Sequence, residues 1–305
     1  MERVGFLYDD ACLAHEPPQW HPEKKERLLH ILNALRTSGL LEKLACINPR
    51  RASLDDVGLV HTASYIETIR SFTGERLDPD TYLSPGTLSA ALYAAGSLME
   101  AAEKCKTGEI RRAFCAVRPP GHHAEADRGM GFCIFNNIAI GARHAQKIGF
   151  TKVFIIDFDA HHGNGTQQIF DESDTVFFFS THQYPYYPET GKDSERGRGK
   201  GEGYTYNVPI LKGSGNKDYL YIYQDILPGL VRRFEPDIIF VSAGYDIHLQ
   251  DPHADIRVTG EGIRCIVQSI LRAYHCPVIF TLEGGYDLRS LEESVMITIE
   301  EMLKN

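Results

Sequence analysis

Acidic and imidazole side chains follow an apolar run at 157–165, where the sequence reads Asp-Phe-Asp-Ala-His-His-Gly-Asn-Gly. On extended backbone, positions i, i+2 and i+4 share one side, so Asp157, Asp159 and His161 should point the same way. An aspartate and a histidine two residues apart supply half of a site for a divalent metal of borderline-soft type. Capping aspartates are the simpler explanation, but so apolar a run rarely ends in two Asp and two His for capping alone. We therefore predict a metal site here.

A second apolar run leads into Ser242-Ala243-Gly244-Tyr245-Asp246, and Asp246 could supply a third ligand. Two carboxylates and one imidazole leave an open coordination position on zinc, which catalytic zinc sites need. Considered alone, this segment is explained better by an aspartate that caps a turn. The prediction of a ligand therefore depends on convergence with Asp159 and His161.

The histidine pair His122-His123 could transfer protons near neutral pH. The preceding turn, Arg118-Pro119-Pro120-Gly121, removes the alternation that a strand would impose, so both imidazoles could face one pocket. Each needs an orienting partner, and Asp157 and Asn164, which flank the metal ligands, are the natural candidates. For a histidine pair taken at random, two hydrogen-bonded loop histidines would be the better explanation.

The fourth cluster is Glu283-Gly284-Gly285-Tyr286, which also follows an apolar run. Paired glycines let the backbone approach a site closely. A tyrosine hydroxyl beside a metal can donate a hydrogen bond to a developing oxyanion. Alone, a glycine turn with a core-packing Tyr286 would explain the segment better, so the case depends on the convergence of all four clusters.

Short β-rich runs alternate with helical patterns along the chain, as in proteins with a parallel α/β sheet. Strands are expected at Val4–Tyr8, Ala113–Val117, Lys152–Asp157, Thr175–Ser180, Tyr204–Val208, Asp237–Ala243 and Pro277–Leu282. Helices are expected at Pro22–Thr37, Ala63–Phe72, Pro85–Lys104, Asn137–Lys147, Asn216–Phe234, Gly260–Tyr274 and Leu288–Leu303. Ligands bind beyond the carboxyl ends of the strands in such sheets, and the four clusters fall at those ends.

Composition restricts the class of protein. The 305 residues are 43% hydrophobic and carry a formal net charge of −9, which disfavours direct nucleic-acid and anionic-membrane binding and suits cationic substrates. The start lacks a secretory-signal pattern, and no apolar run approaches the roughly 18 residues of a membrane span. Seven scattered cysteines without a Cys-x-x-Cys pattern favour a reducing cytoplasm. Nothing in the sequence indicates an oligomeric state.

No repeat or linker interrupts the chain, so we predict one domain over residues 1–305. The glycine-rich, charged segment 189–203 is expected to be a mobile surface loop.

Taken together, these motifs resemble the histone deacetylase and acetylpolyamine amidohydrolase superfamily. The resemblance covers about residues 8 to 290 and is carried by several long motifs in the family's order, including His21-Pro22-Glu23, Arg118–His123, Gly129–Asn137, Asp157–Gly165, Ser242–Asp246 and Glu283–Tyr286. It implies an arginase-like single α/β domain, with a central, mostly parallel eight-stranded sheet and helices on both faces.

The resemblance also implies roles for individual residues. Zinc, or ferrous iron, would be held by Asp159, His161 and Asp246. The proton-handling pair would be His122 and His123, linked to Asp157 and Asn164 respectively, with Tyr286 as the transition-state tyrosine. The walls of a tunnel for the acylated side chain would be Gly131, Phe132 and Tyr187, with His253 at the mouth. A structural potassium ion would be bound by backbone oxygens of Asp157, Asp159, His161 and Thr181 and by the Ser180 side chain.

The implied activity is hydrolysis of an acetyl-lysine or acetylpolyamine amide. Polyamine-selective relatives carry a glutamate directly after an Asp-Pro pair at the tunnel mouth, whereas here Asp251-Pro252 is followed by His253, so we expect a preference for acyl-lysine. A dimanganese ureohydrolase is the rival enzyme, but Asp246 lacks a second aspartate two residues on. A non-catalytic acetyl-lysine binder is the rival from another class. Trp20 would either narrow the tunnel entrance or pack on the first helix.

Overall fold

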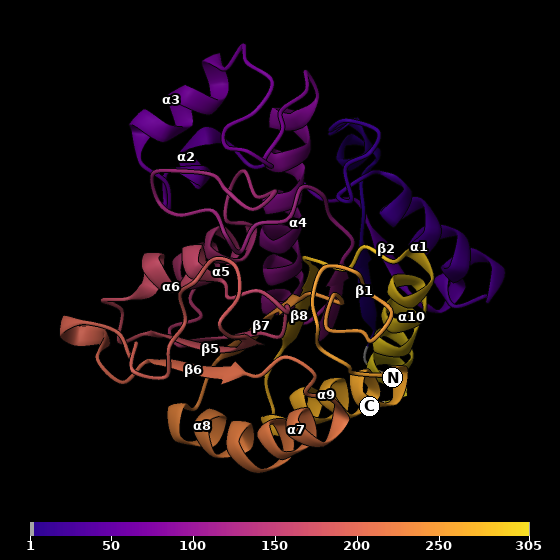
Figure 1. The fold of residues 1–305 in the computed structure, drawn as a ribbon, viewed down its shortest axis with the longest axis vertical. Helices are drawn as coiled ribbons and strands as arrows, with labels where there is room; N and C mark the ends of the chain where they lie inside the picture. The colour runs from indigo at the N-terminus through magenta and orange to yellow at the C-terminus, as the bar shows by residue number, and fades with distance from the viewer. Residues whose placement is uncertain (1–2, 305) are drawn as a thin grey trace.

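Eight strands form one all-parallel sheet in the order β2-β1-β3-β8-β7-β4-β5-β6 (Figure 1). The structure is a computed structural model that describes residues 3–304. The strands are β1 (Val4–Leu7), β2 (Ala45–Ile47), β3 (Arg112–Cys115), β4 (Val153–Asp157), β5 (Val176–Gln183), β6 (Thr205–Ile210), β7 (Ile238–Ala243) and β8 (Val278–Leu282). Every residue of β4, β5, β7 and β8 is buried. Their apolar residues do not alternate with polar ones, because helices cover both faces of the sheet, and the polar residues lie toward the carboxyl ends of the strands.

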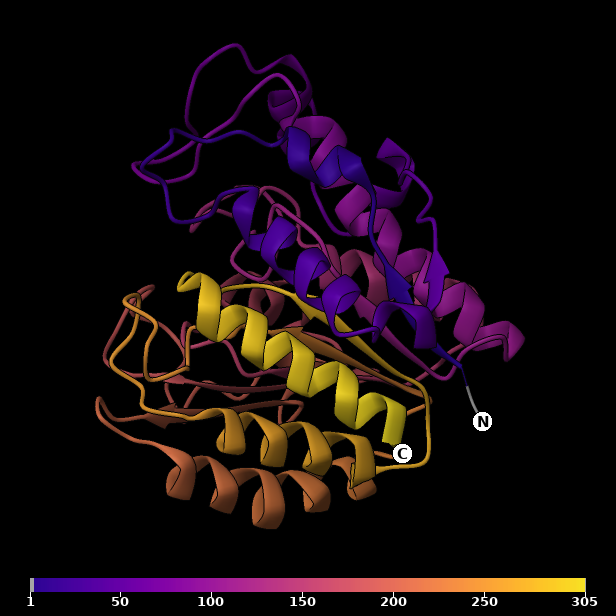
Figure 2. The same cartoon turned by 90° about the vertical axis from the view of Figure 1, so that its right-hand side faces the viewer.

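The helices form two layers around this sheet. Their bounds are α1 (Glu26–Thr37), α2 (Leu54–Val57), α3 (Ala63–Ser71), α4 (Thr87–Thr107), α5 (Asn137–Lys147), α6 (Asn164–Phe170), α7 (Asn216–Tyr221), α8 (Leu227–Phe234), α9 (Gly260–Ala273) and α10 (Leu288–Lys304). Helices α1, α10, α9, α7 and α8 lie side by side on one face, as Figure 2 shows. Helices α4, α5 and α6 lie on the other face, and α2 and α3 pack at the upper end of α4 in Figure 1. Within residues 3–304, none of the helices combines the length and apolarity that crossing a bilayer requires.

The predicted fold is confirmed as a single α/β domain, with differences in its elements. The sheet is entirely parallel, and the strand β2 is absent from the sequence-based set because three partly exposed residues give too short a pattern. The short helices α2 and α6 were also not expected. The helix expected from Asn216 to Phe234 is interrupted by one π-helical turn at Ile222–Ile226.

One helix start is wrong in the sequence-based prediction. Helix α1 begins at Glu26, not at Pro22. The physical reason is that Glu23 is buried and its carboxylate binds Arg118 and Arg27, so the segment before the helix follows this ion pair rather than the helical path.

The strand order determines which loops meet. The adjacent strands β3, β8, β7, β4 and β5 all point the same way, so the segments that follow them lie together at one edge of the sheet. Those segments contain the histidine pair, the Gly-Gly-Tyr turn, Asp246, the Asp-His cluster and a tyrosine-rich loop. This is the edge where α/β proteins bind ligands.

Candidate active site

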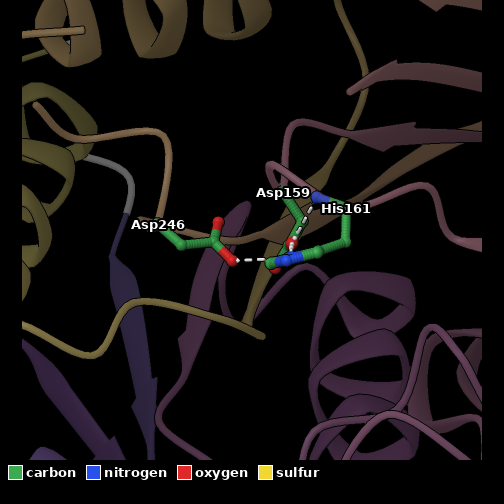
Figure 3. Close-up of side chains that lie close together, drawn as sticks. All are labelled: Asp159, His161 and Asp246. Carbon is green, nitrogen blue, oxygen red and sulfur yellow. Dashed lines mark hydrogen bonds and ion pairs between the residues drawn. The ribbon is translucent and has the colours of Figure 1, made fainter. Parts of the chain in front are cut away.

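Three of the expected metal ligands converge. Donor atoms of Asp159, His161 and Asp246 all lie within 4.8 Å of one another. His161 Nδ1 is 3.0 Å from Asp159 Oδ1 and 3.0 Å from Asp246 Oδ2, and Figure 3 shows the two carboxylates approaching the imidazole from separate segments. Within residues 3–304, no other group of three such side chains is close enough to hold a metal ion.

The second oxygen of each carboxylate is held by the backbone. Asp159 Oδ2 accepts the N–H of Gly284 at 2.8 Å, and Asp246 Oδ1 accepts the N–H of Ala160 at 2.9 Å. These bonds fix both side chains, so that the remaining oxygens face His161. The carboxylates are therefore oriented before any ion binds, as outer hydrogen bonds orient metal ligands in general.

The electrostatics of this triad favour a cation. Burial and the neighbouring Asp159 carboxylate raise the pKa of Asp246 to about 7. Burial alone would lower the pKa of His161, but the two carboxylates raise it well above its usual value. Two buried carboxylates around one nitrogen need positive charge between them. The Asp-His-Asp donor set matches the nitrogen and oxygen ligands of a three-ligand zinc site.

The two histidines that follow β3 lie beside the triad. The ring centroids of His122 and His123 are 4.0 Å apart, and His122 Nε2 is 3.8 Å from Asp159 Oδ2. His122 Nδ1 lies 3.0 Å from Asp157 Oδ2. Although burial opposes it, the carboxylates of Asp157 and Asp159 raise the pKa of His122 to about 10. His122 thus favours the protonated form.

His123 is held in the opposite state. Burial and the neighbouring imidazoles of His122 and His161 lower the pKa of His123 well below its usual value. Its Nδ1 lies 2.8 Å from Asn164 Oδ1, and Asn164 Nδ2 donates to Glu125 Oε1 at 2.8 Å. The Glu125 carboxylate fixes the amide with its oxygen toward the ring, so Nδ1 carries the proton and Nε2 the lone pair. Sequence reasoning missed Glu125, which lies between the motifs Arg118–His123 and Gly129–Asn137.

A cavity of about 240 Å³ opens beside this cluster. It is lined by Asp80, His123, Gly131, Phe132, His161, Tyr186, Tyr187, His253 and Tyr286. All four expected tunnel residues are in this set. The ring centroids of Tyr187 and His123 lie 5.3 Å apart, and those of Phe132 and Tyr286 lie 5.7 Å apart. Sequence reasoning missed Asp80 and Tyr186, although Tyr186 directly precedes an expected wall residue.

The wall beside His123 requires a glycine. Gly131 has φ +55°, in the left-handed region, and a Cβ at this position would lie 2.5 Å from the His123 ring. The next residue, Phe132, also has a positive φ of 69° and is thereby turned into the cavity. The backbone of this loop therefore passes directly beside the histidine.

Tyr286 reaches the cavity from a tightly held loop. Its backbone N–H donates to Asp251 Oδ2, and Asp251 Oδ1 accepts the N–H of His253. Arg27 donates to the carbonyl of Gly285 at 2.7 Å, and its guanidinium lies 5.0 Å from the Tyr286 ring centroid. Burial raises the pKa of Tyr286 well above its usual value, so its hydroxyl stays protonated. Sequence reasoning gave neither Arg27 nor Asp251 a role.

The residues expected around potassium lie on neighbouring strands. Ser180 on β5 is paired in register with Asp157 on β4, and both are buried. Ser180 Oγ also lies 2.9 Å from His182 Nδ1, and Thr181 Oγ1 lies 3.0 Å from Tyr223 Oη. The binding of potassium stays a prediction.

Trp20 has two interpretations from the sequence, at the tunnel entrance or packed on the first helix. Its side chain is 72% exposed, so it does not pack under the first helix. Its ring lies 5.8 Å from that of His21, whose ring is 4.6 Å from the cavity residue Phe132. Trp20 does not itself line the cavity, and its narrowing of the entrance stays a prediction.

Comparison with known proteins decides the family. Residues 21–302 match the model of the histone deacetylase domain. The chain belongs to the histone deacetylase family. It is 40% identical over 293 residues to a probable deacetylase of Archaeoglobus fulgidus, covering 93% of this chain and 82% of that protein. It superposes on the crystal structure of the HDA15 HD domain with a TM-score of 0.95 at 35% identity, covering 100% of this chain and 90% of that one.

Other histone deacetylase family members are longer. Histone deacetylase 5 of Arabidopsis thaliana is 36% identical over 99% of this chain, which spans 49% of that protein. The polyamine deacetylase HDAC10 of Mus musculus is 35% identical over 99% of this chain, which spans 47% of that protein. The family and these relatives support a hydrolase that acts on amide bonds.

Proposed function

We propose that this protein is a zinc-dependent deacetylase that removes acetyl groups from lysine side chains. The observation that carries the proposal is one cavity that is lined by His161 of the Asp-His-Asp triad, by His123 of the histidine pair and by Tyr286. The three-ligand donor set supports a catalytic metal, because it leaves a coordination position open. The family supports cleavage of an amide bond.

The chain's own residues divide the work of the reaction. Asp159, His161 and Asp246 would hold a zinc ion, which would supply Lewis acidity toward the amide carbonyl and lower the pKa of a bound water. His123 Nε2 takes a proton from the attacking water, because His123 is neutral and its Nδ1–H is committed to Asn164.

The same groups complete the cleavage. As the water oxygen bonds to the carbonyl carbon, the Tyr286 hydroxyl donates a hydrogen bond to the developing oxyanion. The leaving nitrogen takes a proton from the imidazolium of His123 or His122 as the C–N bond breaks. Asp157 stabilises the charged form of His122 through its 3.0 Å contact. The products are a free amine and acetate.

An acetylpolyamine is the second candidate substrate. The relative HDAC10 is named a polyamine deacetylase, and the Asp80 carboxylate lines the cavity here, where it could attract a cation. Against it stands His253, which occupies the mouth position where polyamine-selective relatives carry glutamate. A dimanganese site receives no support, because the described residues bring together one triad only.

Two further parts of the proposal have indirect support. Structural potassium near Asp157, Ser180 and Thr181 is supported by their burial on neighbouring strands and by their oxygen-rich chemistry. A cytoplasmic location is supported by the free thiols of all seven cysteines.

A substrate comparison tests the proposal. Purified enzyme reconstituted separately with zinc or ferrous iron is assayed on an acetyl-lysine peptide and on N-acetylputrescine. We expect turnover of the peptide with a higher kcat/KM than of the polyamine, and one catalytic ion per chain. Faster turnover of N-acetylputrescine would reverse the substrate assignment, and no turnover of either would refute the activity.

A further inference from the structure

A fourth buried carboxylate lies at the end of β8, outside the groups used above. Glu283 is fully buried and is not among the residues that line the cavity. Its Oε2 accepts the backbone N–H of Gly121 at 2.7 Å and that of His122 at 3.3 Å. Its Oε1 accepts the hydroxyl of Ser242, on the adjacent strand β7, at 3.0 Å. One side chain thus connects two central strands to the turn that carries the histidine pair.

The same turn is held at a second point. Asn137, the first residue of α5, donates through Nδ2 to the carbonyl of Pro119 at 3.0 Å. The turn is therefore fixed between a donor from the helical layer and an acceptor from the sheet. Prolines at 119 and 120 provide no N–H groups of their own. Glu283 supplies the acceptor that the two buried N–H groups after them require.

The catalytic geometry depends on the backbone at this turn. His122 and His123 make their contacts with Asp157 and Asn164 at 3.0 and 2.8 Å, which leaves little tolerance for displacement. Because the Glu283 carboxylate accepts the backbone N–H of His122, it fixes the backbone position from which the His122 imidazole extends. Misplacement of a reacting group by about 1 Å can cost on the order of 10²-fold in rate.

We propose that Glu283 is a positioning residue, whose side-chain acceptor holds the backbone of Gly121 and His122 so that the two imidazoles face the metal triad. This inference rests on the proposed function, because it assigns the imidazoles their catalytic orientation. What the turn requires is an acceptor at the reach of a glutamate side chain, not a negative charge. Burial, partly offset by His122, raises the pKa of Glu283 to about 7, which agrees with a site that does not strongly stabilise the charge.

Two conservative variants separate reach from charge. Glu283→Gln keeps the length and can turn its amide oxygen to the two N–H groups while its NH₂ donates to the Ser242 hydroxyl. Glu283→Asp keeps the charge but is one methylene shorter. We expect kcat of Glu283→Gln within about threefold of wild type, and kcat of Glu283→Asp lowered at least ~10-fold with KM within about twofold.

A third variant controls for changes in the strand. Thr281 is buried on β8, and its hydroxyl has no hydrogen-bond partner among residues 3–304. Thr281→Val should therefore leave kcat unchanged. Each variant is measured well below its Tm and with its metal content determined, so that unfolding and metal loss are separated from misplacement.

Crystal structures of both Glu283 variants provide a readout that does not depend on activity. The imidazoles of His122 and His123 should be displaced in Glu283→Asp and unmoved in Glu283→Gln. The inference is overturned if the glutamine variant loses kcat while the aspartate variant keeps it, or if the turn stays in place in both. If wild type has no deacetylase activity, the proposed function fails, and the displacement of the turn still decides the role of Glu283. If Glu283→Asp does not fold, the inference is tested by Glu283→Gln alone. Loss of activity in folded Glu283→Gln would then overturn the inference.

Discussion

The substitution Tyr286→Phe isolates one hydroxyl of the proposed mechanism. The ring contacts remain available to phenylalanine: Phe132 at 5.7 Å, His253 at 4.5 Å and the Arg27 guanidinium at 5.0 Å from the Tyr286 ring. Burial keeps the pKa of the hydroxyl well above its usual value, so it is a donor at any practical assay pH. The substitution therefore removes one hydrogen-bond donor at the cavity and little packing.

The size of the effect follows from that single donor. Loss of one preorganised oxyanion donor costs about 2.7–4 kcal/mol of transition-state stabilisation, which is about 10²–10³ in kcat. The Tyr286 hydroxyl makes no hydrogen bond to another residue within 3–304, so the free energy of unfolding should change by less than about 0.5 kcal/mol. We expect KM to change little, because the hydrogen bond strengthens mainly in the transition state.

A second tyrosine provides the matched control. Tyr65 lies on α3, far from Tyr286 in the sequence. Its buried hydroxyl donates to the carbonyl of Ile134 at 2.7 Å. Tyr65→Phe should cost about 1–3 kcal/mol of unfolding free energy without lowering kcat. Steady-state kinetics and urea unfolding are measured for both variants. A Tyr286→Phe enzyme that retains kcat within about threefold of wild type would refute the oxyanion role.

Three other perturbations give independent tests. Asp246→Ala should reduce the metal content measured by mass spectrometry from about one ion per chain to a small fraction, since two ligands remain; full occupancy would contradict the assigned triad. His253→Glu should raise kcat/KM for N-acetylputrescine relative to an acetyl-lysine peptide by about 10-fold at low salt, and an unchanged ratio would remove this position from substrate selection. Although burial opposes it, Arg118 holds the pKa of Glu23 well below its usual value, so the stabilisation from Glu23 is present above about pH 4.3 and lost as pH falls below it. Glu23→Gln should therefore lower the unfolding free energy by about 3–5 kcal/mol at pH 7, with a gap to wild type that narrows in acid; a gap independent of pH would contradict the ion pair.

The metal triad could be predicted in part because its members follow strands of one parallel sheet. Spacing alone placed Asp159 and His161 together, since they are two residues apart. The convergence of Asp246 depends on β7 lying next to β4, and strand order is not encoded in any local pattern. The family resemblance supplied that information, whereas composition and periodicity did not.

The supporting residues could not be predicted, because their roles arise from long-range contacts. Glu283 looked like part of a glycine turn, although its carboxylate bonds residues more than 160 positions away. Arg27 and Asp251 hold the Tyr286 loop from elsewhere in the chain. The short helix α6 was missed because it begins at Asn164-Gly165, and glycine disfavours helices by about 1 kcal/mol.

The site contains several buried carboxylates, and the fold must offset the free-energy cost of burying them. Asp157, Asp159, Asp246 and Glu283 are each at most 1% exposed. An unpaired buried carboxylate costs several kcal/mol, and backbone N–H groups at the strand ends offset part of that cost. Burial raises the pKa of Asp246 and of Glu283 to about 7, which reduces their charge, and a divalent cation held by Asp159, His161 and Asp246 would offset most of what remains. Because the carboxylates that bind the metal are the ones that the backbone already orients, affinity for the metal and placement of the reacting groups arise from the same hydrogen bonds.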